Sequence, residues 1–206
     1  SGAAAALSGL LASELVKTVC QISSSKEKLK EHHSTLGFID KQIRDEIKPK
    51  LIKLFQKDCD TFDRVMHYRK LQKEADSDKE KKKFQRKERR HMKTATEIPL
   101  KIGDLCLKIA SHANTIFDVG YRAVRGDSGA AGSIAISGAS TSIFVAFLNL
   151  QKFRQSDWAI KHREKTESLH NDIKGAQVEL LKRVTDIQDI NPEDLQIQFD
   201  FDDETE

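Results

Sequence analysis

Between Ser128 and Gln151 the chain carries no charged residue, although a third of all its residues are charged. Glycine, alanine and serine fill most of this stretch, and Asp127 stands directly before it. Ile134, Phe144 and other large apolar side chains argue against a flexible linker. A membrane span would be long enough, but seven Ser, Thr and Asn residues and three glycines leave the stretch only mildly apolar. The sequence therefore predicts a buried central helix whose small side chains let another helix, or a ligand, come close.

A similar small-residue pattern opens the chain, where alanines occupy residues 3–6 and Gly9 follows, within a first helix expected at 2–22. Two such helices can pack tightly on one another or across a dimer. Helical periodicity runs through most of the remaining sequence, and no alternating strand pattern interrupts it. The other expected elements are helices at 26–47, 50–72, 91–117 and 156–187, a highly charged helix-forming stretch at 75–90, and an irregular segment at 118–127.

These patterns predict an all-α fold, an elongated helical bundle around the small-residue helix. Residues 1–190 are expected to form one domain, followed by an acidic tail at 191–206. Hydrophobic residues make up 38% of the chain, which is lean for a globular protein. Burial is therefore expected to be completed at a subunit interface, and the bundle to be a homodimer.

Charge is concentrated at residues 69–93, where twelve Lys and Arg face five Asp and Glu. The usual explanation of such a run is a solvated helix face. The alternative is a rim that attracts a polyanionic ligand. Only Phe84 interleaves with the charges, and single-strand RNA binding usually needs several stacking aromatic residues. With a net charge of only +3, nucleic acid is not an expected partner.

Cys20, Cys59 and Cys106 are odd in number and widely spaced, which fits reduced thiols in a cytoplasmic protein. Residues 1–13 lack the basic segment of a signal peptide, and neither secretion nor a membrane partner is expected. The seven histidines show no metal-ligand spacing, and no glycine-rich phosphate-binding motif occurs. Neither a metal nor a nucleotide cofactor is therefore predicted.

One acid falls on an apolar helical face in LIKLFQKDCDTFDRVM, residues 51–66. A period of 3.6 residues through the apolar positions requires an apolar residue near 58, and the chain has Asp58 there. Phe62 and Met66 belong to the same predicted buried stripe. A buried carboxylate must be paired, hydrogen-bonded or protonated. Asp58 is therefore either a general acid/base lining a cleft or a structural acid bridged to Lys or Arg.

Four segments together resemble the cyclodeaminase/cyclohydrolase family, which acts on one-carbon units bound to tetrahydrofolate. The first is SGAAAALSGLLASELVKTVCQI at the start of the chain, similar to the family's first helix. KDCDTFDRVM is similar to its Asp-x-x-x-Phe segment, and KTATEIPL, residues 93–100, to its Thr-Ala-Thr-x-x-Pro-Leu. The fourth, from Asp127 to Leu150, matches the Asp-x-Gly helix that ends near an Asn.

The resemblance implies an all-α homodimer with a folate site between helices near the dimer interface, and no cofactor beyond a tetrahydrofolate-type substrate. It places the proposed catalytic acid on Asp58. The residues that it implies for substrate binding are Asp127, Ser128, Gly129, Lys73 and Asn149. The strip GYRAVRGD, residues 120–127, departs from the family's Gly-Asn-x-Asn-x-x-Ser-Asp, so a changed ligand is an open alternative.

The expected function is an enzyme of folate one-carbon metabolism that uses a buried Asp as general acid/base. Either cyclodeamination of formiminotetrahydrofolate or hydrolysis of methenyltetrahydrofolate fits, because both reactions need a proton acceptor and donor beside a carbon flanked by two nitrogens. Lys81, Lys82, Lys83 and Arg86 are candidates to attract the glutamate tail of a folate. The alternative is a non-catalytic helical binding module.

Overall fold

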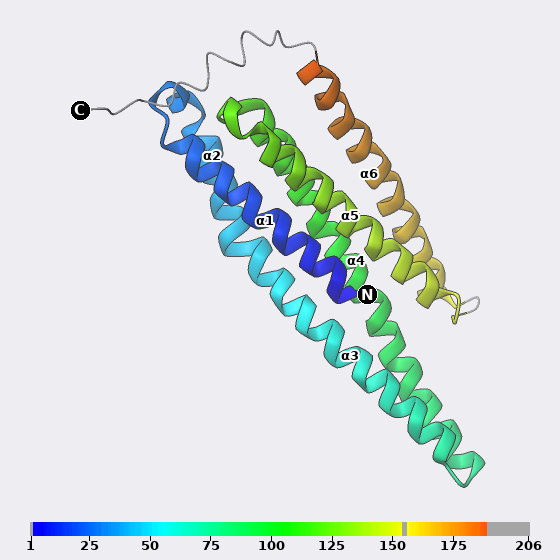
Figure 1. Cartoon of the computed structure of the whole chain (residues 1–206). Coiled ribbons are helices and arrows are strands. Elements are labelled where there is room, and N and C mark those ends of the chain that lie inside the picture. Colours follow the sequence, from blue (N-terminus) through cyan, green and yellow to red (C-terminus); the bar gives the residue numbers. More distant parts are fainter. Residues whose placement is uncertain (1, 154–155, 189–206) are drawn as a thin grey trace.

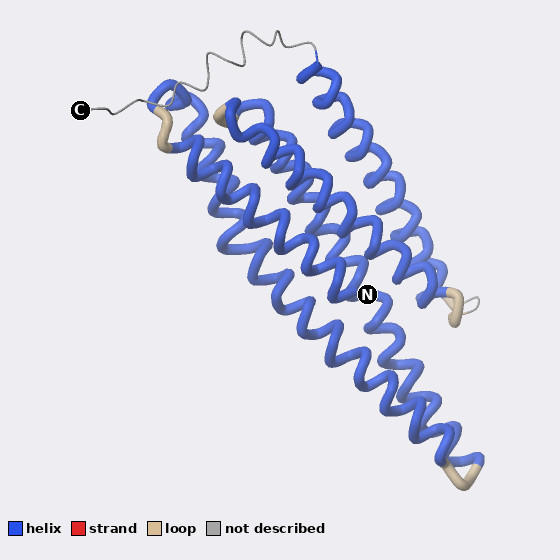
Figure 2. The backbone as a smooth tube through the Cα atoms, viewed as in Figure 1, coloured by secondary structure: helices blue, strands red, loops and turns tan. Residues whose placement is uncertain are grey.

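The computed structural model describes residues 2–153 and 156–188 and consists of long helices joined by short loops (Figures 1 and 2). No strand occurs among these residues, and the predicted all-α, elongated bundle is confirmed. The helices are α1 (Gly2–Ser24), α2 (His33–Gln42), α3 (Lys48–Glu74), α4 (Asp78–Val119), α5 (Arg125–Leu150) and α6 (Asp157–Gln188). The single-domain boundary at residue 190 stays a prediction, and the acidic tail lies outside the described residues.

Two connections differ from the prediction. Residues 26–47 do not form one helix: a 3-10 helix (Glu27–His32) precedes α2, and a π-helical turn (Ile43–Ile47) joins α2 to α3. The break comes at Leu29, whose φ of −108° and ψ of 16° are not helical. Residues 118–127 are largely helical rather than irregular, because α5 already begins at Arg125. Asp127 therefore lies inside the first turn of α5 and not in a loop before it.

The hairpin between α3 and α4 projects past the start of α1 and the end of α5 as a two-helix arm, residues 66–90 (Figure 1). Ser77 is the N-cap of α4: its Oγ accepts a hydrogen bond from the Glu80 N–H at 3.3 Å and donates one to the Glu80 carboxylate. Arg69 and Glu88 form an ion pair at 2.9 Å across the arm. Each helix of the arm is covered mainly by the other one. Most side chains of the arm are therefore charged.

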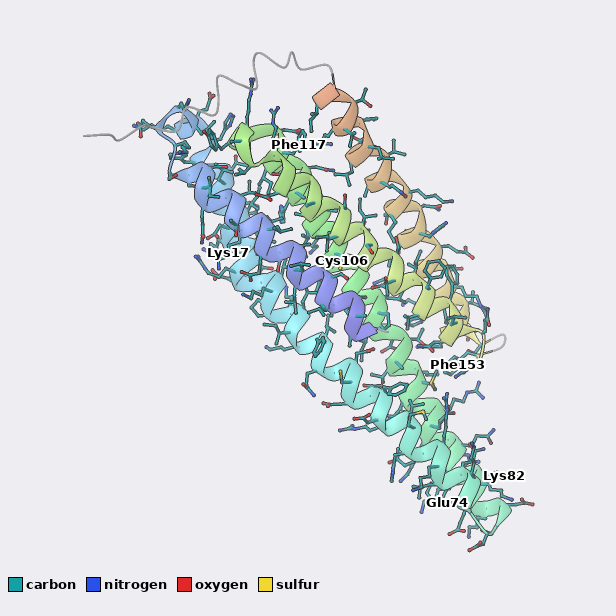
Figure 3. The ribbon with its side chains drawn as sticks, in the orientation of Figure 1. Lys17, Glu74, Lys82, Cys106, Phe117 and Phe153 are labelled. Atoms are coloured by element: carbon teal, nitrogen blue, oxygen red, sulfur yellow. The ribbon has the colours of Figure 1, made fainter. Side chains whose placement is uncertain are left out.

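The small-residue helix α5 contacts α1, α4 and α6 and lies at the centre of the bundle, as predicted. At Gly138, an added Cβ would lie 3.0 Å from Cys106 Sγ and 3.1 Å from the Ala5 carbonyl oxygen. A Cβ added at Gly9 on α1 would lie 3.0 Å from the same sulfur. Three helices thus converge on Cys106, labelled in Figure 3, and only glycine allows this distance. Burial raises the pKa of the Cys106 thiol to about 12, so it stays neutral and packs as an apolar side chain.

Two segments, Gly2–Ser24 and Arg122–Leu150, are long and apolar enough to cross a membrane by length and composition. In the apolar 18-residue stretch of each, 44% and 50% of the residues, respectively, are buried inside the bundle. Core helices of globular proteins pass the same criterion, so the expected absence of a membrane partner stays a prediction.

Candidate functional site

The buried face of α3 consists of Leu51, Asp58, Thr61 and Val65, which recur at helical spacing. The predicted inward orientation of Asp58 is therefore correct, and its residue exposure is 9%. Phe62, predicted on the same stripe, is instead 60% exposed, and Met66 is exposed as well. The buried side of α3 is thus narrower and more polar than the sequence indicated.

The partner of Asp58 is the first turn of α1. Asp58 Oδ2 accepts a hydrogen bond from the backbone N–H of Ala3 at 2.8 Å, across 55 residues of sequence. The first N–H groups of a helix lack partners within it and carry the positive end of the helix dipole, so a carboxylate is stabilised there. Among the described residues no Lys or Arg pairs with this acid. The alternative, a structural acid bridged to Lys or Arg, is therefore not observed among the described residues.

Gly2 allows this approach. A Cβ at this position would come within 2.6 Å of Asp58 Cγ, far inside contact distance. The sequence predicted that the small residues at the start of α1 pack against another helix. They also admit a carboxylate, and no local pattern could have shown which acid it was.

The second carboxylate oxygen of Asp58, Oδ1, has no hydrogen-bond partner among the described residues. The residue as a whole is buried, with 9% of its surface exposed. A carboxylate with one oxygen fixed and the other without a hydrogen-bond partner can accept a proton from a water or substrate held against it. That is the chemistry that this part of the molecule supports.

Asp127, Ser128 and Gly129 lie together in the first turn of α5, at the end of the bundle where α4 stops. Asp127 is exposed, whereas Ser128 is buried and donates its hydroxyl to the Val124 carbonyl at 3.4 Å. Gly129 has open space around its Cα. The structure does bring these three predicted residues together, as neighbours in one turn.

Asn149 has a visible structural role. Its Nδ2 donates to the Ala95 carbonyl oxygen at 2.9 Å. Pro99 lies inside the continuous helix α4 and has no N–H to offer to the carbonyl four residues earlier, which is that of Ala95. Asn149 supplies the missing donor from α5, and α4 runs unbroken through its proline. The motif around Pro99 thus provides the acceptor, and Asn149 the donor, of one contact between α4 and α5.

The predicted site residues do not meet at one place within the chain. Lys73 lies on the arm, 15 residues beyond Asp58 on α3, or about 22 Å along the helix. Ser128 and Asn149 are separated by 21 residues of α5, about 32 Å. One small molecule bound to a single chain therefore cannot contact both Ser128 and Asn149.

The basic run also lies elsewhere than expected. Glu74 and Lys82 mark the far end of the arm (Figure 3). From Asp58 to Glu74 is 16 residues of α3, about 24 Å, so Lys81, Lys82 and Lys83 are remote from the buried acid. Positive charge nearer to Asp58 comes from Lys57 and Arg64, which the sequence did not single out, and from Arg90, which belongs to the charged run at 69–93. The signal for Lys57 and Arg64 was their spacing with Lys50 and Lys53 along one face of α3.

Three comparisons with known proteins agree with this picture. The formiminotransferase-cyclodeaminase family model matches residues 1–168. The methenyltetrahydrofolate cyclohydrolase of Methylorubrum extorquens is 27% identical over 171 residues, which are 82% of this chain and 79% of that protein. The crystal structure of formiminotetrahydrofolate cyclodeaminase from Thermotoga maritima matches with a TM-score of 0.75 at 18% identity, over 90% of this chain and 87% of that one.

The structural likeness confirms the fold. Both relatives are named as enzymes, a cyclohydrolase and a cyclodeaminase, which confirms the prediction of an enzyme of one of these types. Because the family model covers most of its length, the chain belongs to the formiminotransferase-cyclodeaminase family.

Proposed function

We propose that the chain is an enzyme of folate one-carbon metabolism that hydrolyses methenyltetrahydrofolate to formyltetrahydrofolate, with Asp58 as the general acid/base. The observation that carries this proposal is the buried carboxylate fixed by the Ala3 N–H, whose other oxygen accepts no hydrogen bond from the described residues. The sequence relative, a methenyltetrahydrofolate cyclohydrolase matched over four-fifths of the chain, supports the choice of substrate. No cofactor beyond the tetrahydrofolate-type substrate is required by this chemistry.

In the proposed reaction Asp58 accepts a proton from a water molecule as that water attacks the methenyl carbon. Asp58 then returns that proton to the leaving nitrogen as its bond to the carbon breaks and the ring opens, and the added hydroxyl releases its proton to solvent as it becomes the formyl carbonyl. The hydrogen bond from Ala3 holds one carboxylate oxygen so that the other is directed toward the substrate. Because a carboxylate alone can move these protons, no further functional group is needed at the reacting carbon.

Cyclodeamination of formiminotetrahydrofolate is the second candidate, favoured by the name of the matching family. There, one folate nitrogen attacks the formimino carbon carried by the other nitrogen, and ammonia leaves. The same carboxylate would move the protons.

The two reactions are separated by assaying purified protein with methenyltetrahydrofolate and, separately, formiminotetrahydrofolate. Loss of the methenyl absorbance on the first substrate, faster than in a protein-free blank, is the expected result. Ammonia release from the second substrate alone would select cyclodeamination instead. If neither substrate turns over, titration with tetrahydrofolate and its formyl form tests whether the chain is a binding module.

We also propose that the enzyme is a homodimer whose contact surface includes the outward faces of α1 and α5. Leu7 and Leu11 on α1 are more than half exposed, and so are Phe144 and Leu148 on α5. The two helices pack against one another, so both of their exposed faces can take part in one contact surface. A second copy would also supply, from its own α5 and arm, predicted site residues that one chain keeps far apart.

Leu7→Glu is expected to convert the dimer to a monomer, because a charge buried in a contact surface is strongly unfavourable. The measurement is molar mass by light scattering during size-exclusion chromatography. Leu181→Glu on α6 is the matched control, since Leu181 is 56% exposed and Leu7 59%. Wild-type protein eluting as a monomer, or equal loss of mass in both variants, would contradict this interface.

A further inference from the structure

Two hollows adjoin one another in the groove between α3 and α4, and Lys57 lines both. The first, of about 540 Å³, has Leu54 and Leu105 as its apolar part. Its remaining lining is Asp104 and five lysines, Lys50, Lys53, Lys57, Lys101 and Lys108. A surface that places apolar side chains inside a ring of lysines suits a ligand that is apolar in its middle and anionic at its edges.

The second hollow, of about 500 Å³, is polar throughout. Arg64 and Arg90 face it from the two helices, together with Lys57 and His91. Burial and the neighbouring charges of Arg64 and Arg90 lower the pKa of His91, so at neutral pH the imidazole adds no charge and offers a hydrogen bond. Two guanidinium groups around a neutral donor are typical of a carboxylate or phosphate site.

The acids in the groove are already engaged. Asp104 pairs with Lys165 of α6 at 2.7 Å, and Asp60 accepts a hydrogen bond from Gln56 at 2.8 Å. Lys50 is paired with Glu46. The other six cations have no salt-bridge partner among the described residues: Lys53, Lys57, Arg64, Arg90, Lys101 and Lys108. Six like charges along one groove attract anions from solution and repel one another until an anion binds.

We infer that the α3–α4 groove binds an elongated small molecule that carries several carboxylate or phosphate groups. From Lys50 to Arg64 the groove follows 14 residues of α3, about 21 Å, which a chain of three or four anionic groups can span. The Arg64–Arg90 hollow takes one anionic end, and the lysines around Leu54 and Leu105 take the rest.

Two sources supply such a molecule. One is the oligoglutamate tail of the substrate, in which case the inference rests on the proposed function. Thr61 lines the second hollow one helical turn from Asp58, so a molecule bound there lies close to the catalytic carboxylate. The other source is a free polyanion that occupies the groove as a separate ligand.

The binding test uses inorganic tripolyphosphate and free tri-γ-glutamate, titrated calorimetrically into wild-type protein. The groove variant combines Lys57→Gln, Arg64→Gln and Arg90→Gln. Its matched control combines Lys81→Gln, Lys82→Gln and Lys83→Gln at the end of the arm, which removes equal charge outside the groove. We expect saturable binding by the wild type, a Kd raised at least about tenfold in the groove variant, and little change in the control.

Steady-state kinetics then identify the source. A KM for triglutamyl methenyltetrahydrofolate that rises in the groove variant, against an unchanged KM for the monoglutamyl form, assigns the groove to the substrate's tail. Tripolyphosphate binding that is lost without any change in KM assigns it to a free polyanion. Equal weakening in both variants, or no binding of either probe by wild type, overturns the inference. Turnover plays no part in the calorimetry, so failure of the proposed reaction leaves that measurement intact.

Discussion

Asp58→Asn is expected to lower kcat by about 100- to 10,000-fold, the range that a single general acid/base contributes. The amide is nearly isosteric with the carboxylate, and its oxygen can still accept the hydrogen bond from Ala3. It cannot take up a proton at neutral pH. The measurement is initial rate at saturating substrate, on whichever of the two folates the wild-type enzyme uses.

Folding must be separated from chemistry, because Asp58 also anchors the start of α1. Loss of the negative charge at that helix terminus is expected to cost about 1 kcal/mol of unfolding free energy, which leaves the protein folded. Asp63→Asn on the same helix is the matched control: Asp63 is exposed, and the change in charge is the same. Full activity in Asp58→Asn, or an equal loss in Asp63→Asn, would remove Asp58 from the mechanism.

Gly138→Val is expected to lower the unfolding free energy by about 3 kcal/mol or more, because α1, α4 and α5 converge at this glycine. A single Cβ there already approaches Cys106 Sγ at 3.0 Å and the Ala5 carbonyl at 3.1 Å. The Ala5 contact is backbone, so the added methyl groups can be accommodated only if α1 moves away from α5. A midpoint of thermal unfolding about 10 °C lower, followed by circular dichroism, is the expected result.

The same substitution at Gly175 on α6 provides the comparison. Nothing lies within 4 Å of a Cβ built at Gly175, and valine has a higher helix propensity than glycine by a few tenths of a kcal/mol. Gly175→Val is therefore expected to leave the midpoint unchanged or slightly raised. If Gly138→Val behaved in the same way, α5 would not be held in close contact with α1.

Helix α3 shows what the periodicity of a sequence can and cannot predict about burial. Spacing along the chain placed Asp58, Leu51 and Val65 on one buried face, and the structure agrees. It also placed Phe62 and Met66 there, yet both are exposed. Periodicity shows which residues share a face of a helix. It does not show how wide a neighbouring helix is or where that neighbour begins, so residues at the edge of the face are assigned wrongly.

The candidate site was predictable only in its central residue. Asp58 stood out because an acid on an apolar face is unusual and costly. Its partner Ala3 is 55 residues away and has no polar side chain, so no sequence pattern marks it. Asn149 was singled out from a motif as a substrate ligand, whereas its visible partner is the carbonyl that Pro99 leaves without a donor. The basic run drew attention to the end of the arm, although five cations outside that run, and Arg90 within it, line the groove nearer to Asp58 without a salt-bridge partner among the described residues.

The sequence by itself determined that the chain is helical, that an uncharged small-residue helix lies at its centre, and that one acid of α3 points inward. These properties follow from composition and spacing within single segments, which act over one or a few helical turns. Only the tertiary structure decided what that acid binds, which helices converge on Cys106, and where the positive charge gathers. Each of these depends on the axial register between helices distant in sequence, and that register is fixed by side-chain packing across the whole bundle.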